Sequence, residues 1–539
     1  MKRFFLFSLV VLVCTLASAQ PWRADLGNGH YRNPVLMADY SDPDVCRVGE
    51  DFYMTSSSFN CVPGLQILHS RDLVNWTIVS AALPDHVPYW NSEKHLGKGV
   101  WAPSIRYHNG LFYIFYGDPD QGIIRLTAPS VEGPWEETMV LPAKGYIDPC
   151  PLWDEDGRVW LVHALAGSRA GLKSVLLMAE LDSTASRVVS PSRIIFDGHT
   201  TQPTCEGPKL YKRNGYYYIF TPAGGVRTGW QTVLRSRDIY GPYEEKIVLE
   251  QGSTNINGPH QGAWVTTAAG DDWFLHFQDR GAYGRVVHLQ PMQWKEDWPV
   301  IGKQGVPVQE FRKPVITENT TAYSNEYTDD FDSATLRLDW QWMAAPEAQW
   351  YYCNTGEGML RLFSVNYPWT GGRHDEWTLE EWLVHAPNLL MQKFPAENFT
   401  VTTRVRFFPK KEVMGEVAGL VISGEKYYYL ALRNEIDRIC IVANGRKESA
   451  NVKPGNWVWL QARFSMYDAN TALCGLYYSY DGEKWNKAND RLLIKQEKDS
   501  WIGCKVGLFC LRPYKPTKGQ DCQTYNDGGY LDVDLWRIE

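Results

Sequence analysis

The chain has 539 residues, of which 44% are hydrophobic and 14% aromatic, and its formal net charge is −8. This length predicts two or three domains, each large enough for a hydrophobic core. The acidic balance argues against a nucleic-acid partner, because proteins bind phosphate backbones through an excess of Lys and Arg. A neutral substrate is compatible with this charge.

The first element in chain order has the pattern of an export signal. Two basic residues precede an apolar run, and the sequence ASA at residues 17–19 has the form of a cleavage site. The pattern predicts a signal peptide over residues 1–19 and a protein of the periplasm or the extracellular space. The run is too short to span a bilayer comfortably, and we expect no membrane insertion elsewhere in the chain.

Residues 28–312 repeat one strand-rich unit five times. Each unit carries an aromatic, β-prone run, and turn residues such as Asn109-Gly110 and Asn214-Gly215 lie at its start. A proline lies 10 or 11 residues before the aromatic residue in the first four units, and the fifth has Pro259 with a gap of 15. Five sheet units of about 45–60 residues predict a five-bladed β-propeller.

The first strand of each blade lines the axis of a propeller, so the residues at the five blade starts are predicted to converge at one end of that axis. These residues are Asp42, Ala102 with Trp101 before it, Asp148, Glu206 and His260. A single Asp before Pro is more often a turn former. Three unpaired carboxylates in register are costly to bury, which favours a functional role for the set.

Three carboxylates in one pocket suit the hydrolysis of a glycosidic bond. One protonates the leaving oxygen, and a second deprotonates a water molecule on the opposite face of the sugar. A third, close to the acid, would raise the pKa of the acid through like-charge repulsion.

Five segments of the chain resemble glycoside hydrolase family 43. They are NPVLMADYSDPDV from Asn33, GVWAPSI from Gly99, YIDPCPLW from Tyr146, CEGPKLYKRNGYYYI from Cys205 and HFQDRGAYGRVVHLQPMQW from His276. Together they cover roughly residues 28–312. The resemblance implies a five-bladed propeller and an inverting hydrolysis by single displacement.

The resemblance also implies a role for each residue at the site. Asp42 would be the general base, Glu206 the general acid, and Asp148 would raise the pKa of the acid and orient it. Trp101 would pack against the terminal sugar, and Arg285 would reach a sugar hydroxyl and the site carboxylates. The carboxyl groups of base and acid should then lie about 6.5–9.5 Å apart, which leaves room for a water molecule.

His260 matches an axial histidine that in the family contacts a bound calcium ion or an ordered water. The sequence GPHQGAW differs from the commoner GHG pattern, and a satisfied core histidine is the alternative. The chemistry itself requires no cofactor, so a calcium ion at the axis would be structural.

Residues 326–539 are expected to form a second domain, after a polar linker that begins near Glu310. Alternating segments such as TVTTRVRFF and WVWLQARF predict an antiparallel β-sandwich. It resembles the concanavalin-like jelly-roll domain of xylosidase-type family members, where this domain contributes to the rim of the pocket. The alternative is an independent carbohydrate-binding module with exposed tryptophans such as Trp350 or Trp369. The segment from Asn366 could be a loop that reaches the first domain.

The sequence therefore predicts an exported, inverting exo-glycosidase that acts on plant polysaccharides or oligosaccharides. We expect release of terminal α-L-arabinofuranosyl residues, because FQDRGAYGR resembles the arabinofuranosidase-rich branch of the family. A β-D-xylosidase with the same mechanism is the main alternative. A non-catalytic glycan-binding propeller would not need three carboxylates, and an endo-arabinanase would need an open cleft.

Overall fold

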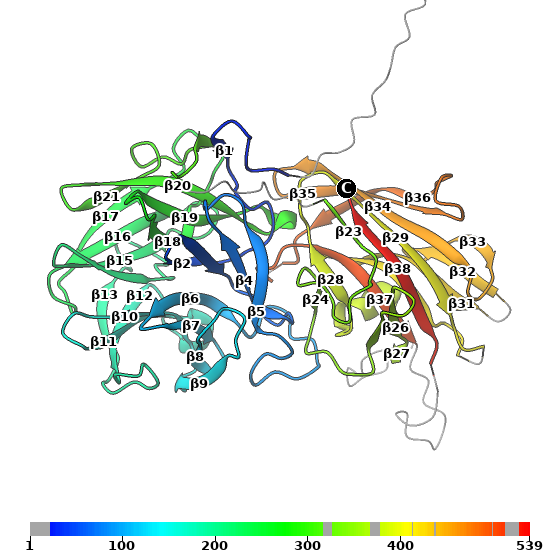
Figure 1. Cartoon of the computed structure of the whole chain (residues 1–539), viewed down its shortest axis with the longest axis horizontal. Coiled ribbons are helices and arrows are strands. Elements are labelled where there is room, and N and C mark those ends of the chain that lie inside the picture. The colour runs from blue at the N-terminus through cyan, green and yellow to red at the C-terminus, as the bar shows by residue number, and fades with distance from the viewer. Residues whose placement is uncertain are drawn as a thin grey trace, which may run out of the picture.

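The computed structural model describes residues 22–315, 326–366, 378–411, 413–435, 438–498, 500–512 and 528–539. Its strands form two bodies that lie side by side, a propeller and a sandwich (Figure 1). The predicted fold class, a five-bladed β-propeller followed by a concanavalin-like β-sandwich, is confirmed. The predicted signal peptide lies outside the described residues, and no helix within them is long and apolar enough to cross a membrane.

Five antiparallel sheets of four strands form the propeller, and each blade takes its strands consecutively from the chain. The second strand of each blade holds the aromatic run and is mostly buried between neighbouring sheets, as expected for aromatic and β-branched residues on a packed pleated surface. The first blade comprises β2 (Asp44–Val48), β3 (Asp51–Thr55), β4 (Gly64–Ser70) and β5 (Thr77–Leu83). The second comprises β6 (Trp101–His108), β7 (Leu111–Asp118), β8 (Gly122–Ala128) and β9 (Glu136–Leu141). The third comprises β10 (Tyr146–Trp153), β11 (Val159–Leu165), β12 (Val175–Leu181) and β13 (Arg193–Asp197). The fourth comprises β14 (Lys209–Arg213), β15 (Tyr216–Ala223), β16 (Trp230–Ser236) and β17 (Glu244–Leu249). The fifth comprises β18 (His260–Thr266), β19 (Asp272–Asp279), β20 (Arg285–Lys295) and β21 (Trp298–Ile301).

Each blade takes its four strands from one continuous stretch of chain, so the two ends of the propeller domain are joined by a separate pair of strands. β1 (His30–Arg32) pairs antiparallel with β22 (Glu310–Arg312), which follows the fifth blade. Next to β1, the side-chain amide of Asn33 donates to the carbonyls of Leu289 and Val308, each at 2.8 Å. This asparagine thereby holds the start of the propeller against its last blade.

Two eight-stranded sheets form the sandwich. The first sheet contains β23 (Tyr327–Asp329), β25 (Tyr351–Asn354), β26 (Met359–Phe363), β29 (Phe399–Phe408), β34 (Trp457–Asp468), β35 (Thr471–Ser479), β36 (Asn486–Lys495) and β38 (Tyr530–Ile538). The second contains β24 (Gln341–Trp342), β27 (Val365–Asn366), β28 (Leu390–Lys393), β30 (Val417–Ser423), β31 (Tyr428–Glu435), β32 (Arg438–Ala443), β33 (Arg446–Val452) and β37 (Lys505–Arg512). Short helices are α1 (Gly167–Ala170), α2 (Leu379–His385) and the 3₁₀ turn η1 (Gly281–Tyr283).

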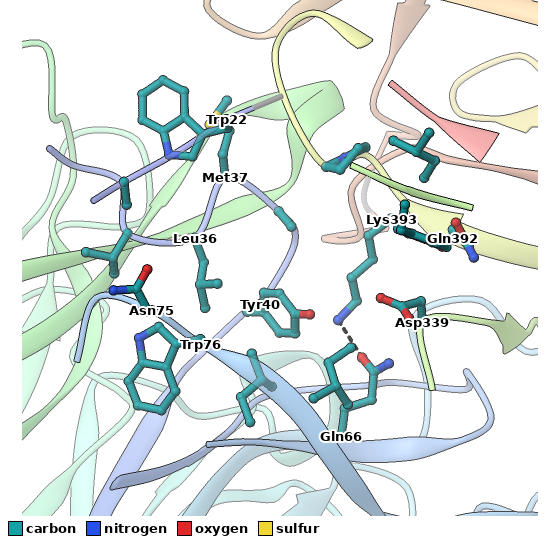
Figure 2. A pocket seen from close by; sticks show the side chains of 18 of the residues that line it. Trp22, Leu36, Met37, Tyr40, Gln66, Asn75, Trp76, Asp339, Gln392 and Lys393 are labelled. Atoms are coloured by element: carbon teal, nitrogen blue, oxygen red, sulfur yellow. Dashed lines mark hydrogen bonds between the residues drawn. The ribbon is translucent and has the colours of Figure 1, made fainter. Parts of the chain in front are cut away.

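The two bodies are joined by a continuous apolar core and by backbone contacts. Propeller residues Met37 and Val286 belong to the same buried cluster as the sandwich core. Val62 and Trp342 exchange backbone hydrogen bonds across the interface, and an interdomain cavity of about 70 Å³ lies beside Lys393 (Figure 2). The interface is therefore packed like a domain interior, which fixes the sandwich relative to the propeller axis.

The exposed-tryptophan alternative for the sandwich is wrong at Trp350. This side chain is only 2% exposed, and its ring lies 5.5 Å from that of Trp342 in the sandwich core. Burial of the apolar surface of the indole favours this inward position. Trp369, and most of the segment after Asn366, lie outside the described residues.

Candidate active site

The five blade starts present two successive positions each to the axis. The second position has a positive φ in every blade, and its residues are Asp42 (55°), Ala102 (36°), Asp148 (56°), Gly207 (58°) and Gln261 (28°). The first position holds Ser41, Trp101, Ile147, Glu206 and His260. The single ring predicted from the sequence is thus corrected: Glu206 and His260 lie one residue earlier in the motif than Asp42 and Asp148. The chain bends at the left-handed residue, so both positions can face one pocket.

That pocket has a volume of about 190 Å³. The described residues that line it are Asp42, Phe59, Trp101, Ala102, Ile147, Asp148, Glu206, Val226, Gln261, Arg285 and Trp501. The structure therefore brings together five of the six predicted site residues, and the sixth, His260, contacts Glu206. Drug-sized ligands occupy pockets of about 300–1,000 Å³, so this smaller volume suits a single sugar unit.

Asp42 is buried and held by three side-chain donors. Its Oδ2 accepts hydrogen bonds from the hydroxyls of Ser41 at 2.7 Å and Ser57 at 2.6 Å. Its Oδ1 accepts from Nη1 of Arg285 at 3.0 Å, and the same nitrogen donates to the Ser41 hydroxyl at 2.8 Å. An ionised carboxylate accepts only, so this surrounding of donors matches the charged form.

Asp148 and Glu206 form a contrasting pair of carboxyl groups with few donors. Oδ2 of Asp148 accepts from the backbone N–H of Gly207 at 2.8 Å and from Nε2 of Gln261 at 3.3 Å. Burial and, next, the negative charge of Glu206 raise the pKa of Asp148 well above its ordinary value. The pair thus holds a proton more readily than two separated carboxylates would.

Glu206 is the most accessible of the three carboxylates. Its side chain is 39% exposed, and Oε1 lies 3.2 Å from Nε2 of His260. His260 itself is 1% exposed, and its Nδ1 has no hydrogen-bond partner among the described residues. This contact orients the Glu206 carboxyl group while leaving it open to the pocket.

Gly207, which follows Glu206, packs closely against the neighbouring blade. Its φ is +58°, and a Cβ atom at this position would lie 2.2 Å from Cγ of Gln261. Only glycine fits both the backbone conformation and the space. The glutamate is thereby placed directly before a turn that cannot move without displacing the neighbouring blade.

Two tryptophans from different domains meet at the mouth of the pocket. Trp101 of the propeller donates from Nε1 to the carbonyl of Gly97 at 2.8 Å. Trp501 of the sandwich lies edge to face with it, with ring centroids 5.1 Å apart and an interplanar angle of 80°. Trp501 is 39% exposed. The sandwich thus contributes an aromatic side to a pocket whose charged groups all come from the propeller.

Five of the described residues that line the pocket were not identified from the sequence, and these are Phe59, Ile147, Val226, Gln261 and Trp501. Gln261 has the positive φ of Asp42 and Asp148, but no proline follows it, so the proline-based alignment passed over it. An alignment on the left-handed position would have found it. Trp501 follows a polar segment far along the chain, and no local pattern connects it with the propeller axis.

Comparisons with known proteins agree with this geometry. The family model Glycosyl hydrolases family 43 matches residues 31–299, and the model Beta xylosidase C-terminal Concanavalin A-like domain matches residues 328–524. A protein of Xylanibacter ruminicola, provisionally named a beta-xylosidase, is 37% identical over 92% of this chain and 88% of its own length. A non-reducing end alpha-L-arabinofuranosidase of Bacteroides ovatus is 30% identical over 79% of each chain. The crystal structure of a family 43 protein of Bacillus licheniformis superposes with a TM-score of 0.79 at 26% identity, covering 94% of this chain and 99% of that one.

Proposed function

The chain belongs to glycosyl hydrolases family 43, and from this premise we propose that it is an inverting exo-glycosidase that removes one terminal pentose at a time. The observation that carries the proposal is the convergence of Asp42, Asp148 and Glu206 in a single small pocket. Three carboxylates beside one arginine are more than a structural ion pair needs. They match the requirements of a base, an acid and a group that tunes the acid.

In the proposed reaction, Asp42 takes a proton from a water molecule as the water oxygen bonds to the anomeric carbon. The hydrogen bonds from Ser41, Ser57 and Arg285 keep its carboxylate oriented, so little reorganisation precedes attack. Glu206 gives its proton to the glycosidic oxygen as the bond to the anomeric carbon breaks. Attack and departure take place on opposite faces, which inverts the anomeric configuration.

Asp148 is assigned the role of tuning and orienting the acid. Its negative charge beside Glu206 makes loss of a second proton unfavourable, and burial strengthens this repulsion. Burial and, next, the charge of Glu206 raise the pKa of Asp148. Arg285 and Trp101 are assigned to substrate, the first to a sugar hydroxyl and the second to the apolar face of the terminal ring.

For the sugar, we propose a terminal β-D-xylosyl residue as the first candidate. The provisional beta-xylosidase name of the Xylanibacter ruminicola relative supports it, as does the match of residues 328–524 to the beta-xylosidase C-terminal domain. The α-L-arabinofuranosyl residue expected from FQDRGAYGR is the second candidate, supported by the Bacteroides ovatus relative. Plant hemicellulose would supply either sugar. The small volume of the pocket and the presence of Trp501 at its edge support exo action on either sugar.

Two further expectations belong to this proposal. Export would follow from the pattern of residues 1–19, and mature protein that begins at Gln20 would support it. A calcium ion beside His260 would need several oxygen ligands, yet the described residues contain no group of three His, Cys, Asp or Glu side chains that could hold a metal. We therefore assign no step to a metal ion.

Proton NMR of the anomeric signal tests both the sugar and the stereochemistry. The purified protein is given 4-nitrophenyl β-D-xyloside and 4-nitrophenyl α-L-arabinofuranoside in parallel. Faster release from the xyloside with α-xylose appearing first is the expected result, and β-arabinose from the arabinoside would instead support the second candidate. First appearance of a sugar with retained configuration would overturn the roles given to Asp42 and Glu206.

A further inference from the structure

Asp39 is a buried carboxylate that connects the pocket wall to the sandwich. Its Oδ1 accepts a hydrogen bond from the backbone N–H of Arg285 at 2.9 Å, and its Oδ2 accepts one from the backbone N–H of Gly503 at 2.8 Å. Asp39 is only 6% exposed, so water cannot readily replace either bond. One side chain therefore joins the arginine that holds Asp42 to the loop that carries Trp501.

The backbones around Asp39 approach each other too closely for side chains to lie between them. A Cβ atom on Gly284, whose φ is +75°, would lie 2.4 Å from Cβ of Asp39. A Cβ atom on Gly503 would lie 2.7 Å from Cα of Gly284. Because no flexible group separates the three segments, a shift of one is passed directly to the others.

The loop that carries Trp501 is attached to the propeller by backbone hydrogen bonds that follow the indole, in addition to the hydrogen bonds of Ser500 within the loop. Trp501 has a φ of +56° and belongs to no strand or helix. Two residues beyond it, Gly503 meets Asp39, and Cys504 then donates its backbone N–H to the carbonyl of Ala282 at 2.9 Å. The bond to Asp39 is thus the nearer of these two attachments to the propeller.

We propose that Asp39 is a positioning residue that places Trp501 over the pocket and couples this rim to the Arg285–Asp42 pair. The residues that line the pocket, within the described chain, do not include Asp39, so it acts through its two N–H donors. Its effect on turnover rests on the proposed glycosidase function. The contact itself does not, and it can be tested without a substrate.

Hydrogen exchange of the full-length protein tests the contact. Asp39→Ala removes both acceptors, whereas Asp39→Asn keeps one and loses the charge. We expect amides of the Ser500–Cys504 segment to exchange at least tenfold faster in Asp39→Ala, with a smaller change in Asp39→Asn. Asp329→Ala is the matched control, because Asp329 is also buried and accepts from two donors, Phe331 N–H and Trp340 Nε1, inside the sandwich. Equal protection of this segment in wild type and Asp39→Ala would overturn the proposal.

A double-mutant cycle with Trp501→Ala tests the consequence for turnover. Asp39→Ala should lower kcat/KM for an unactivated pentosyl disaccharide about tenfold, mainly through KM. The same change made in the Trp501→Ala background should have a much smaller effect, because the group that it positions is gone. A merely structural role would give independent, additive losses, and that result would refute coupling through Trp501. If wild type cleaves neither pentoside, the proposed function fails, while the exchange experiment still decides the contact.

Discussion

The protein buries ionisable side chains at the propeller axis and at the domain interface, but only the axis has the arrangement of a reaction centre. At the interface, the ammonium of Lys393 lies 3.6 Å from the ring centroid of Tyr40 and donates to Oε1 of Gln66 at 2.8 Å (Figure 2). Burial and then the charge of Lys505 lower the pKa of Lys393 to about 7. At the axis, burial and the charge of Glu206 raise the pKa of Asp148. Both shifts favour the neutral form.

The difference lies in the neighbours of each group. Lys393 faces a ring and an amide oxygen, and the charge that acts most strongly on it is that of a second ammonium, Lys505, so no proton donor and acceptor are paired there. Asp148 is repelled by a second carboxylate that is open to the pocket, so a proton bound to Asp148 relieves the repulsion between them. A shifted pKa thus marks burial in both places, whereas convergence of like charges around an accessible cavity marks the site of chemistry.

The largest expected effects come from removing the proposed base or acid. Asp42→Asn and Glu206→Gln should each lower kcat on a disaccharide by about 10³–10⁴-fold, since each deletes a proton-transfer step. With a 2,4-dinitrophenyl pentoside, whose leaving group needs no proton, Glu206→Gln should recover most of its activity and Asp42→Asn should not. Steady-state kinetics on the two substrates measure this. Equal recovery of both variants would contradict the separate roles. Sugar binding without turnover, in wild type and in both variants alike, would indicate a lectin.

Asp148→Asn is expected to lower activity and raise stability together. We expect kcat to fall about 10²-fold, because the charge beside Glu206 is lost. The unfolded chain releases the Asp148 proton near pH 3.8, whereas the folded state keeps it to higher pH. Wild-type stability therefore falls as pH rises through that interval, because the folded state binds more protons. The variant lacks this loss, so its melting temperature should exceed that of wild type by a few degrees at pH 7 and by less at pH 4.

Asp154→Asn is the control for that stability effect. Although burial acts to raise its pKa, hydrogen bonds from Lys212 and Tyr217 hold the pKa of Asp154 below its ordinary value. Its replacement should therefore destabilise the same blade at pH 7. A melting temperature that fell for both variants would show that the carboxylates at the axis are no more strained than an ordinary ion pair.

The sequence predicted a residue's position where that position depends on interactions within its own blade, and not where it depends on contacts between distant parts of the chain. The repeat of prolines and aromatic runs predicted the propeller and brought Asp42, Asp148 and Glu206 into one pocket, because each is set by local chain geometry within its own blade. Trp501 could not be found in this way, since its place depends on contacts between two domains. Trp350 was expected to be exposed, but its burial depends on packing against Trp342 in the sandwich core, which the local sequence does not show.

Trp501→Ala tests whether the sandwich contributes to the axis site by contact alone. The aromatic contact is worth about 0.5–1.5 kcal/mol beyond its buried area, which predicts a three- to tenfold rise of KM for a disaccharide with little change in kcat. Tyr480→Ala is the matched control, because Tyr480 is an aromatic residue of the sandwich that is 52% exposed and does not line the described pocket. A similar rise of KM in both variants would mean that the sandwich acts through general stability rather than through this rim.

Lys393→Met should have the smallest effect and should appear only in stability. The folded state releases the Lys393 proton near pH 7, while the unfolded chain keeps it to about pH 10.5. Wild-type stability therefore rises from pH 7 to 10.5, because the unfolded state binds more protons in that window. Met removes the cost of the buried charge, so the variant should gain about 1 kcal/mol at or below pH 7, and the gain should fade towards pH 10. Melting temperatures across pH 6–10 measure it, with Lys393→Arg as a control that keeps its charge throughout. Parallel curves for wild type and Lys393→Met would show that the contacts with Tyr40 and Gln66 fully offset the free-energy cost of burying the ammonium. The interface, unlike the axis, would then hold no destabilising charge.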